Sequence, residues 1–239
     1  MTGSSLVVVL TSPSGTGKST IIRDLLEGDP RLAFSVSHTT RPPRDEERHG
    51  VDYQFITRHC FEELRAAGTF LEWAEYNGDL YGTSQEEVRR ARGAGLDLLL
   101  EIEVQGARQI SVRIPEAVTI FLMPPGYPEL VRRLRGRGTE SEASIERRLR
   151  TASREIRHYP EFRYLVVNGT VAQAMREIRE ILDSERGLAA GASDLRTSAR
   201  RALADGIVAT FPEPGPGPGR APMDPGTSGG GAGSPGAPA

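Results

Sequence analysis

The feature that constrains the fold most is a series of short, continuous apolar runs separated by helical patterns. The runs cover residues 6–10, 96–100, 118–122 and 165–167. Side chains alternate between the two faces of a strand, so a run without polar alternation indicates a strand buried on both faces. Such strands with helices between them predict an α/β fold, in which a parallel sheet is covered by helices on both sides.

The predicted helices cover residues 18–27, 128–134, 139–158 and 171–184. Gly28 ends the first of them. The segment Thr139 to Glu142 has the spacing of a capping box, which predicts the start of the long helix toward His158. Thr170 is the predicted cap of the last helix.

The stretch 35–87 breaks this alternation, because it is polar and lacks long apolar runs. It is long enough to form a subdomain inserted into the sheet. We therefore predict one domain over residues 1–186, with a core made of residues 5–34 and 88–186.

The composition changes beyond residue 186. Pro212 to Ala239 holds 8 Pro and 9 Gly in 28 residues, too few apolar groups to offset the chain entropy of folding. We predict that residues 212–239 are disordered. Residues 187–211 are predicted to be a partly ordered extension, in which Asp194 caps a short helix through Ala204. Deletion of residues 187–239 should then leave function intact.

Composition also excludes several classes of protein. A hydrophobic fraction of 37% with 26% charged residues is typical of a globular chain, and no apolar run approaches the roughly 18 residues of a membrane span. A net charge of -2 argues against a general nucleic-acid binder. The single cysteine, Cys60, cannot form an internal disulfide, which favours a reducing compartment. We expect a cytoplasmic protein with no membrane or nucleic-acid partner, and the sequence leaves its oligomeric state unknown.

The segment after the first apolar run has the composition of a phosphate-binding loop. Its residues are Ser12, Pro13, Ser14, Gly15, Thr16, Gly17, Lys18, Ser19 and Thr20. Small residues let backbone N–H groups approach phosphate oxygens, a lysine reaches the β- and γ-phosphates, and a Ser or Thr hydroxyl binds Mg²⁺. Lys18 and Ser19 fit these roles, although Ser12 stands where the first glycine of the pattern is expected. The sequence thus predicts a P-loop NTP hydrolase-like core that binds ATP.

The basic residues single out the same loop. Of 30 Lys and Arg residues, 29 are arginine and only Lys18 is lysine. An arginine would fit poorly there, because its planar fork is wider than the compact ammonium group that a phosphate cradle holds. A chance turn rich in Gly and Ser would not explain this position of the lysine.

A second constellation lies downstream. Arg41 and Arg44 are three residues apart around two prolines, which suits a clamp on one phosphate group. The segment 37–47 and the following Gly50 to Tyr53 resemble the S-x-x-T-R-x-P-R-x-x-E and G-x-D-Y motifs of the guanylate kinase family, whose loop reads S-G-x-G-K-S/T. The resemblance spans about residues 5–185 and continues through residues 70–74, 81–83, 101–106, 137–140 and 166–168.

This resemblance implies that GMP binds in the inserted subdomain, residues 35–87. The GMP-binding residues that it implies are Ser37, Arg41, Arg44, Glu47, Tyr53, Glu72, Tyr81, Gly82, Thr83, Glu101 and Glu103. Chemistry supports Glu72 as the guanine reader, because a carboxylate can accept from N1–H and the 2-amino group together. The unprotonated N1 of adenine would leave that carboxylate facing a lone pair. Without the flanking motifs, Glu72 would be interpreted as a solvated strand residue.

Glu101 and Glu103 follow a predicted strand, at positions where the family commonly has one or two aspartates. Glu101 is a candidate to hold Mg²⁺ through water or to brace the P-loop, and Glu103 to contact guanine. Both are alternatively charges that close a strand. The resemblance further implies that Arg137 and Arg148 lie on a helical lid, about residues 135–158, over the ATP phosphates. Asn168 matches an adenine-contacting position, and a role in the Asn168–Gly169 turn is the alternative.

The resemblance therefore implies a guanylate kinase, which transfers the γ-phosphate of ATP to GMP, and also dGMP, with Mg²⁺ in purine nucleotide metabolism. Lys18, Arg41, Arg137 and Arg148 are the implied catalytic residues, acting by positioning and electrostatic stabilisation. Two alternatives stay open: a binding module of this family that has lost catalysis, and a kinase for another phosphate acceptor. Lys18 with Ser19 favours an enzyme, and Glu72 with its neighbours favours guanine.

Overall fold

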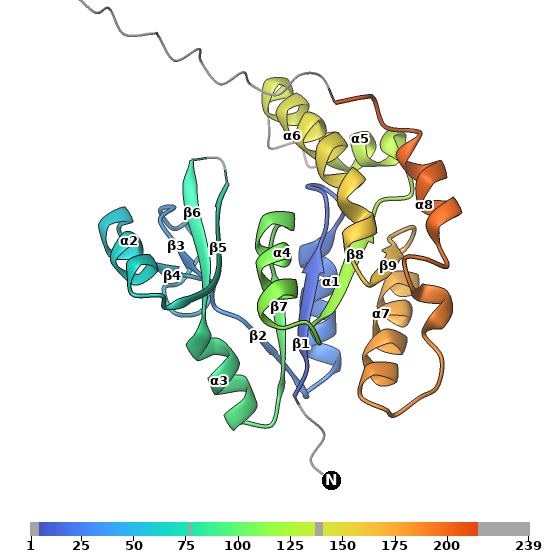
Figure 1. Cartoon of the computed structure of the whole chain (residues 1–239). Helices are drawn as coiled ribbons and strands as arrows, with labels where there is room; N and C mark the ends of the chain where they lie inside the picture. Colours follow the sequence, from blue (N-terminus) through green and yellow to red (C-terminus); the bar gives the residue numbers. More distant parts are fainter. Residues whose placement is uncertain (1–4, 77, 137–140, 215–239) are drawn as a thin grey trace, which may run out of the picture.

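The computed structural model describes residues 5–76, 78–136 and 141–214. Its centre is a parallel sheet with the strand order β2-β7-β1-β8-β9 (Figure 1). The strands are β1 (Val7–Thr11), β2 (Leu32–Phe34), β7 (Asp97–Glu101), β8 (Val118–Met123) and β9 (Tyr164–Val167). The predicted parallel α/β core is confirmed. The edge strand β2 was not predicted.

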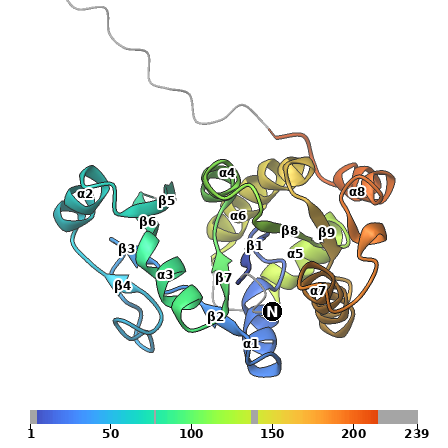
Figure 2. The same ribbon diagram turned by 60° about the horizontal axis from the view of Figure 1, so that its bottom comes forward.

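Helices cover both faces of this sheet, as Figure 2 shows for α1 and α7 on one side and α4 and α6 on the other. The helices of the core are α1 (Lys18–Gly28), α3 (Gln85–Gly93), α4 (Val104–Arg113), α5 (Tyr127–Arg135), α6 (Glu142–Glu155) and α7 (Val171–Glu185). Alternate residues of β1 serve the two faces. Val8 and Leu10 pack with α1 and α7, whereas Val7 and Val9 belong to the opposite cluster. This double burial is why the strand is apolar without interruption.

A second, smaller sheet stands beside the core, at the left of Figure 1. It has the order β4-β3-β6-β5 and mixes parallel and antiparallel pairs. Its elements are β3 (His38–Thr39), β4 (Gln54–Phe55), α2 (Arg58–Ala66), β5 (Phe70–Tyr76) and β6 (Asp79–Ser84). Phe61, Phe70 and Leu80 form a separate apolar core under it. The predicted mixed-β insertion is therefore confirmed.

The long helix near the predicted lid begins later than its capping pattern indicated. Ser141 is the cap of α6, and its hydroxyl accepts from the backbone N–H of Ser144. The predicted cap, Thr139, lies outside the described residues, as does Arg137. A 3₁₀ helix, η1 (Ile156–Glu161), continues from α6 past His158. Thr170, by contrast, caps α7 as predicted, since its side chain accepts from the N–H of Gln173.

The packed fold does not end at Arg186, which corrects the sequence-based boundary. Residues 187–214 continue through η2 (Ser193–Leu195) and α8 (Arg201–Val208). The side chains of Leu195, Ile207 and Phe211 are buried in the two main apolar clusters. Asp194 is not the cap of a helix through Ala204: it lies inside η2, and α8 starts only at Arg201. Most of the predicted disordered tail, residues 215–239, lies outside the described residues.

In the ranges that the structure describes, no helix is long and apolar enough to cross a membrane.

Candidate active site

The loop from β1 to α1 curls tightly around the start of the helix. Gly15 (φ 87°) and Gly17 (φ 96°) have left-handed backbone, which other residues adopt only with strain. A Cβ atom on Gly15 would also lie 2.7 Å from Cδ2 of Leu134. Thr16 closes the curl, because its hydroxyl donates to the carbonyl oxygen of Pro13 at 2.7 Å. The glycines are therefore required by the backbone path, which leads the loop's N–H groups to the N-terminus of α1.

A cavity of about 470 Å³ lies beside this loop. It is lined by Gly15, Gly17, Thr20, Arg132, Arg133, Gly136, Asn168, Gly169 and Val171. Two side chains tie its wall to the loop. The amide nitrogen of Asn168 donates to the carbonyl oxygen of Thr16 at 2.7 Å, and Nη1 of Arg133 donates to the same oxygen at 3.0 Å. The cavity thus combines a helix N-terminus with two arginines, which suits an anionic ligand.

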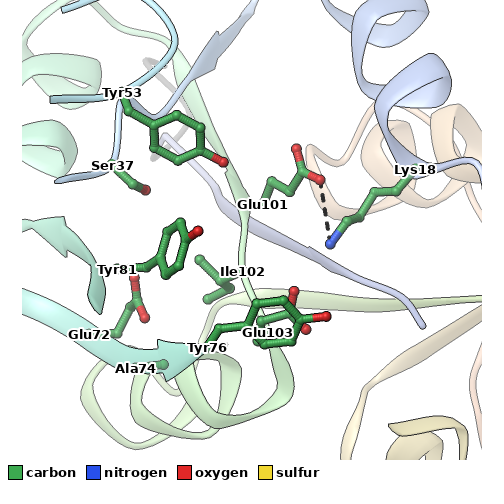
Figure 3. Close-up of a pocket in the computed structure, with 10 residues that line it drawn as sticks. All are labelled: Lys18, Ser37, Tyr53, Glu72, Ala74, Tyr76, Tyr81, Glu101, Ile102 and Glu103. Atoms are coloured by element: carbon green, nitrogen blue, oxygen red, sulfur yellow. Dashed lines mark ion pairs between the residues drawn. The ribbon is translucent and has the colours of Figure 1, made fainter. Parts of the chain in front are cut away.

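Lys18, at the first position of α1, faces the carboxyl end of β7. Parallel pairing of β1 with β7 brings Leu10 opposite Glu101, and the ammonium nitrogen of Lys18 lies 3.5 Å from Oε1 of Glu101 (Figure 3). Burial alone would lower the pKa of Lys18. The carboxylates of Glu101, Glu103 and Glu155 outweigh it and raise that pKa above its ordinary value. The ammonium group is therefore held in its charged form.

A second cavity, of about 170 Å³, joins this lysine to the smaller sheet. Its wall, drawn in Figure 3, is made by Lys18, Ser37, Tyr53, Glu72, Ala74, Tyr76, Tyr81, Glu101, Ile102 and Glu103. The smaller sheet and its loops supply six of these residues, and β7 with the residues after it supplies three. Lys18 therefore reaches the boundary between the two parts of the fold.

Glu72 is the most deeply buried acid of this cavity, with 3% of its surface exposed. Burial raises its pKa to about 7, although hydrogen bonds from Thr83 on the neighbouring strand oppose the rise. The hydroxyls of Thr83 and Ser37 lie 3.2 Å apart, so all three polar groups share one wall. Gly106 lies against this carboxylate, and a Cβ atom there would collide with it. Packing against Glu72 therefore explains the glycine at position 106 near the start of α4.

Comparison with known proteins identifies the relatives of this arrangement. The model of the guanylate kinase family matches residues 4–185. The chain belongs to the guanylate kinase family. A guanylate kinase of Synechococcus sp. (strain JA-3-3Ab) is 50% identical over 176 residues, which cover 74% of this chain and 81% of the relative. One of Dechloromonas aromatica (strain RCB) is 44% identical over 191 residues, 80% and 94% of the two chains.

A solved structure supports the same family. The crystal structure of guanylate kinase from Anaplasma phagocytophilum superposes with a TM-score of 0.64 at 31% sequence identity. The match covers 85% of this chain and 95% of that one. The family model ends at residue 185, so the extension with η2 and α8 lies outside that match.

The two arginines of the guanylate kinase motif differ in their placement. Arg41 pairs with Glu47 at 2.9 Å, lies 5.5 Å from the ring centre of Tyr53 and hydrogen-bonds with Tyr81. Arg44 points to solvent, with 78% of its side chain exposed. The structure therefore brings Arg41 against two tyrosines of the cavity wall and leaves Arg44 in solvent. Glu47 holds Arg41 in place rather than lining the cavity.

Gly82, also implied by the family resemblance, has a packing role. A Cβ atom there would lie 3.0 Å from both Phe61 and Phe70. Of the two lid arginines, Arg137 lies outside the described residues. Arg148, on α6, donates from Nε to the hydroxyl of Ser14 at 2.9 Å, so it contacts the P-loop itself.

Asn168 braces the P-loop through Thr16, and its Oδ1 is buried without a protein partner within the described part of the chain. Both predicted roles are compatible with this position, at the end of β9 and in the wall of the larger cavity.

Three residues of the site were not predicted: Arg133, Tyr76 and Glu155. Arg133 is one of many arginines, and only its contacts distinguish it. Glu155 lies seven residues after Arg148 and hence two turns along the same helix face, which is a signal that could have pointed to it.

Proposed function

We propose that the chain is a guanylate kinase that transfers the γ-phosphate of ATP to GMP, giving ADP and GDP. The observation that carries this proposal is the position of Lys18. Its loop borders the 470 Å³ cavity, and its side chain lines the 170 Å³ cavity of the smaller sheet. A side chain that stabilises phosphoryl transfer between two nucleotides must lie between their binding sites. The P-loop and Lys18 are intact, which argues against a binding module without catalysis.

The larger cavity is the proposed ATP site. The N–H groups of the P-loop and the N-terminus of α1 would hold the β- and γ-phosphates, with Lys18 between the two nucleotides. Arg133 contacts the loop at Thr16 and Arg148 contacts it at Ser14, so both would offset the charge of the phosphates. Asn168 lies where the 6-amino group of an adenine could donate to its Oδ1, which is unpartnered among the described residues.

The smaller cavity is the proposed GMP site. The ionised carboxylate of Glu72 would accept from N1–H and the 2-amino group of guanine, and the hydroxyls of Ser37 and Thr83 would contact the remaining edge. Arg41 and the two tyrosines Tyr53 and Tyr81 would hold the GMP phosphate. Burial raises the pKa of Tyr53 to about 12, so its hydroxyl stays a hydrogen-bond donor.

The site also fits Mg²⁺ carried by the nucleotide. Ser19 exposes its hydroxyl at the first turn of α1, and Glu101 supplies a carboxylate next to Lys18. Both are oxygen ligands, which Mg²⁺ prefers. Within the described residues no group of three acidic, His or Cys side chains could enclose a metal, so phosphates and water would complete its shell. When bound, Mg²⁺ would offset charge on the transferring phosphate.

In this arrangement the protein catalyses by alignment and charge. The attacking oxygen belongs to the ionised phosphate of GMP, so no general base is needed. Lys18, Arg41 and Arg148 surround the space between the two cavities with positive charge, which stabilises the spread negative charge of phosphoryl transfer. Arg137 is proposed to join them from the lid, and Glu103 to contact guanine.

A comparison of acceptors tests the proposal. ADP release from Mg-ATP should be measured with GMP, dGMP, AMP and ribose 5-phosphate. GMP and dGMP should be accepted, and kcat/KM for AMP should be lower by about 10⁴-fold, because adenine leaves Glu72 unpaired. Equal use of AMP would refute the assignment of Glu72, and preference for ribose 5-phosphate would refute the substrate class.

The raised pKa of Glu72 predicts a pH dependence of GMP binding. The ligand-free carboxyl titrates near pH 7, and only its ionised form accepts both guanine donors. Affinity should be constant above about pH 8 and fall below pH 6 by about tenfold per pH unit. The dissociation constant of GMP, measured by calorimetry between pH 5.5 and 8.5, checks this.

Glu72→Gln is the matched control for that titration. The amide keeps one acceptor atom and replaces the other with an NH₂ group, which places a donor against a guanine donor, so affinity for GMP at pH 8 should fall about 30- to 100-fold. The step near pH 7 should also vanish, leaving only the ionisation of the GMP phosphate near pH 6. A step near pH 7 that persists in the variant would show that another group causes it.

A further inference from the structure

The helix α6 contacts the P-loop at one residue from two directions. Nε of Arg148 donates to the hydroxyl of Ser14 at 2.9 Å, and the carboxylate of Glu155 accepts from the backbone N–H of the same residue. Arg148 and Glu155 are two turns apart and share one helix face. This face of α6 is therefore docked on the loop by both a side-chain and a backbone contact of Ser14.

Glu155 lies in a polar junction that stability alone does not explain. It is the last residue of α6, and its Oε2 is buried without a hydrogen-bond partner among the described residues. Burial and the charge of Glu103 raise its pKa to about 8, and the charge of Lys18 opposes this rise. A buried carboxylate with an unpaired oxygen costs free energy, and an apolar residue would serve packing better. Its benefit must therefore come from the groups that it holds.

We propose that Glu155 is a positioning residue for phosphoryl transfer. Its contact with Ser14 fixes the P-loop, and the fixed loop orients Arg148 and Lys18 toward the reacting phosphates. The inference rests on the proposed function. Glu155 touches neither nucleotide in this scheme. It holds the backbone of the loop. Because Glu155 and Arg148 share one face of α6, it also fixes the position of α6 relative to the loop.

The two kinetic constants distinguish this role from simple structural support. The raised pKa keeps much of Glu155 uncharged at neutral pH, so its removal takes no favourable contact from the ATP phosphates and should not weaken ATP binding. The loss of alignment should instead appear in the chemical step, where small displacements of charged groups are costly. A positioning role therefore predicts a fall in kcat without a rise in KM for ATP.

The experiment compares Glu155→Ala and Glu155→Gln in the full chain. The alanine variant should lose about 10- to 100-fold in kcat, with KM for ATP unchanged or lower and the GMP dissociation constant unchanged. Glutamine keeps an acceptor for the Ser14 N–H and should restore kcat to within about threefold of the parent. Glu146→Ala and Glu146→Gln are the controls: Glu146 lies on the same helix, is 65% exposed and pairs with Arg150 at 3.6 Å. Both should behave as the parent.

Hydrogen exchange supplies a readout that does not need activity. In Glu155→Ala, amide exchange of the loop peptide that contains Ser14 should be about 10-fold faster or more, and Glu155→Gln should restore protection. A parent protein that fails to phosphorylate GMP would refute the proposed function, whereas the exchange result would still test Glu155. Unchanged kcat and exchange in the alanine variant would overturn the inference. So would a joint rise of both KM values with a lower Tm, which would show structural support only.

Discussion

Replacement of Lys18 by alanine should reduce kcat for transfer from ATP to GMP by about 10³-fold or more. The ammonium group is 12% exposed and lies between the proposed nucleotide sites, 3.5 Å from Glu101. Removal of one preorganised positive donor from a transition state of this kind typically costs 10²- to 10³-fold. The variant also leaves Glu101, Glu103 and Glu155 without their shared counter-charge. Their ionised carboxylates would then repel the incoming phosphates. GMP binding should change little, since Glu72 and Arg41 carry it.

Lys18→Arg is the matched variant, because it keeps the charge and changes the shape. It should remain at least about 100-fold below the parent, since the planar guanidinium does not fit the space of an ammonium group. Turnover is measured as ADP release and GMP affinity by calorimetry. Activity of Lys18→Ala within tenfold of the parent would contradict the mechanism. An arginine variant as active as the parent would show that charge alone suffices and that the lone lysine has no special meaning.

Deletion of residues 192–239 should destabilise the protein strongly, contrary to the expectation from sequence. The deletion removes the buried side chains of Leu195, Ile207 and Phe211. It also removes Arg200, which pairs with Glu177 at 2.6 Å, and the hydrogen bond between Tyr159 and Asp205. Three large apolar side chains contribute about 5 kcal/mol or more of burial, of which the ordering entropy of the extension offsets a part. We expect Tm to fall by about 10 °C.

Two further variants separate the causes. Phe211 packs on Tyr127 with ring centres 5.3 Å apart, and Phe211→Ala should by itself cost about 3 kcal/mol. Deletion of residues 215–239 leaves every described contact in place and should not change Tm or kcat. Thermal unfolding followed by circular dichroism measures all three proteins. An unchanged Tm after deletion of residues 192–239 would show that η2 and α8 do not contribute to the stability of the fold.

The sequence predicted the parts of this molecule whose cause is local. The P-loop is specified by its own glycines and by Lys18, and a strand buried on both faces must be apolar throughout. The role of Glu72 could be predicted only from the family motifs that flank it, because a lone glutamate in a strand is ordinary. Its burial and its raised pKa depend on Thr83 and Gly106, which come from other elements of the fold.

The parts that escaped prediction depend on contacts between distant segments. The extension after residue 186 is rich in Ala and Arg, and only its packing on Tyr127 and the larger apolar cluster turns Phe211 into a core residue. Arg44 belongs to the same motif as Arg41, yet its side chain is 78% exposed and lies 3.9 Å from Glu47, whereas Arg41 pairs with Glu47 at 2.9 Å and also contacts Tyr81. Arg133 was hidden for the same reason, since no local pattern shows that its side chain meets the P-loop, and Glu155 had only its seven-residue spacing from Arg148 to point to it.

Phosphoryl transfer to GMP can be followed directly with a label. ATP labelled on its γ-phosphate is incubated with Mg²⁺, the parent protein and GMP, and the labelled products are separated. The label should appear in GDP, one GDP for each ADP formed, and little inorganic phosphate should form when GMP is absent. Label that stays in ATP, or that appears as inorganic phosphate whether or not GMP is present, would contradict phosphoryl transfer to GMP.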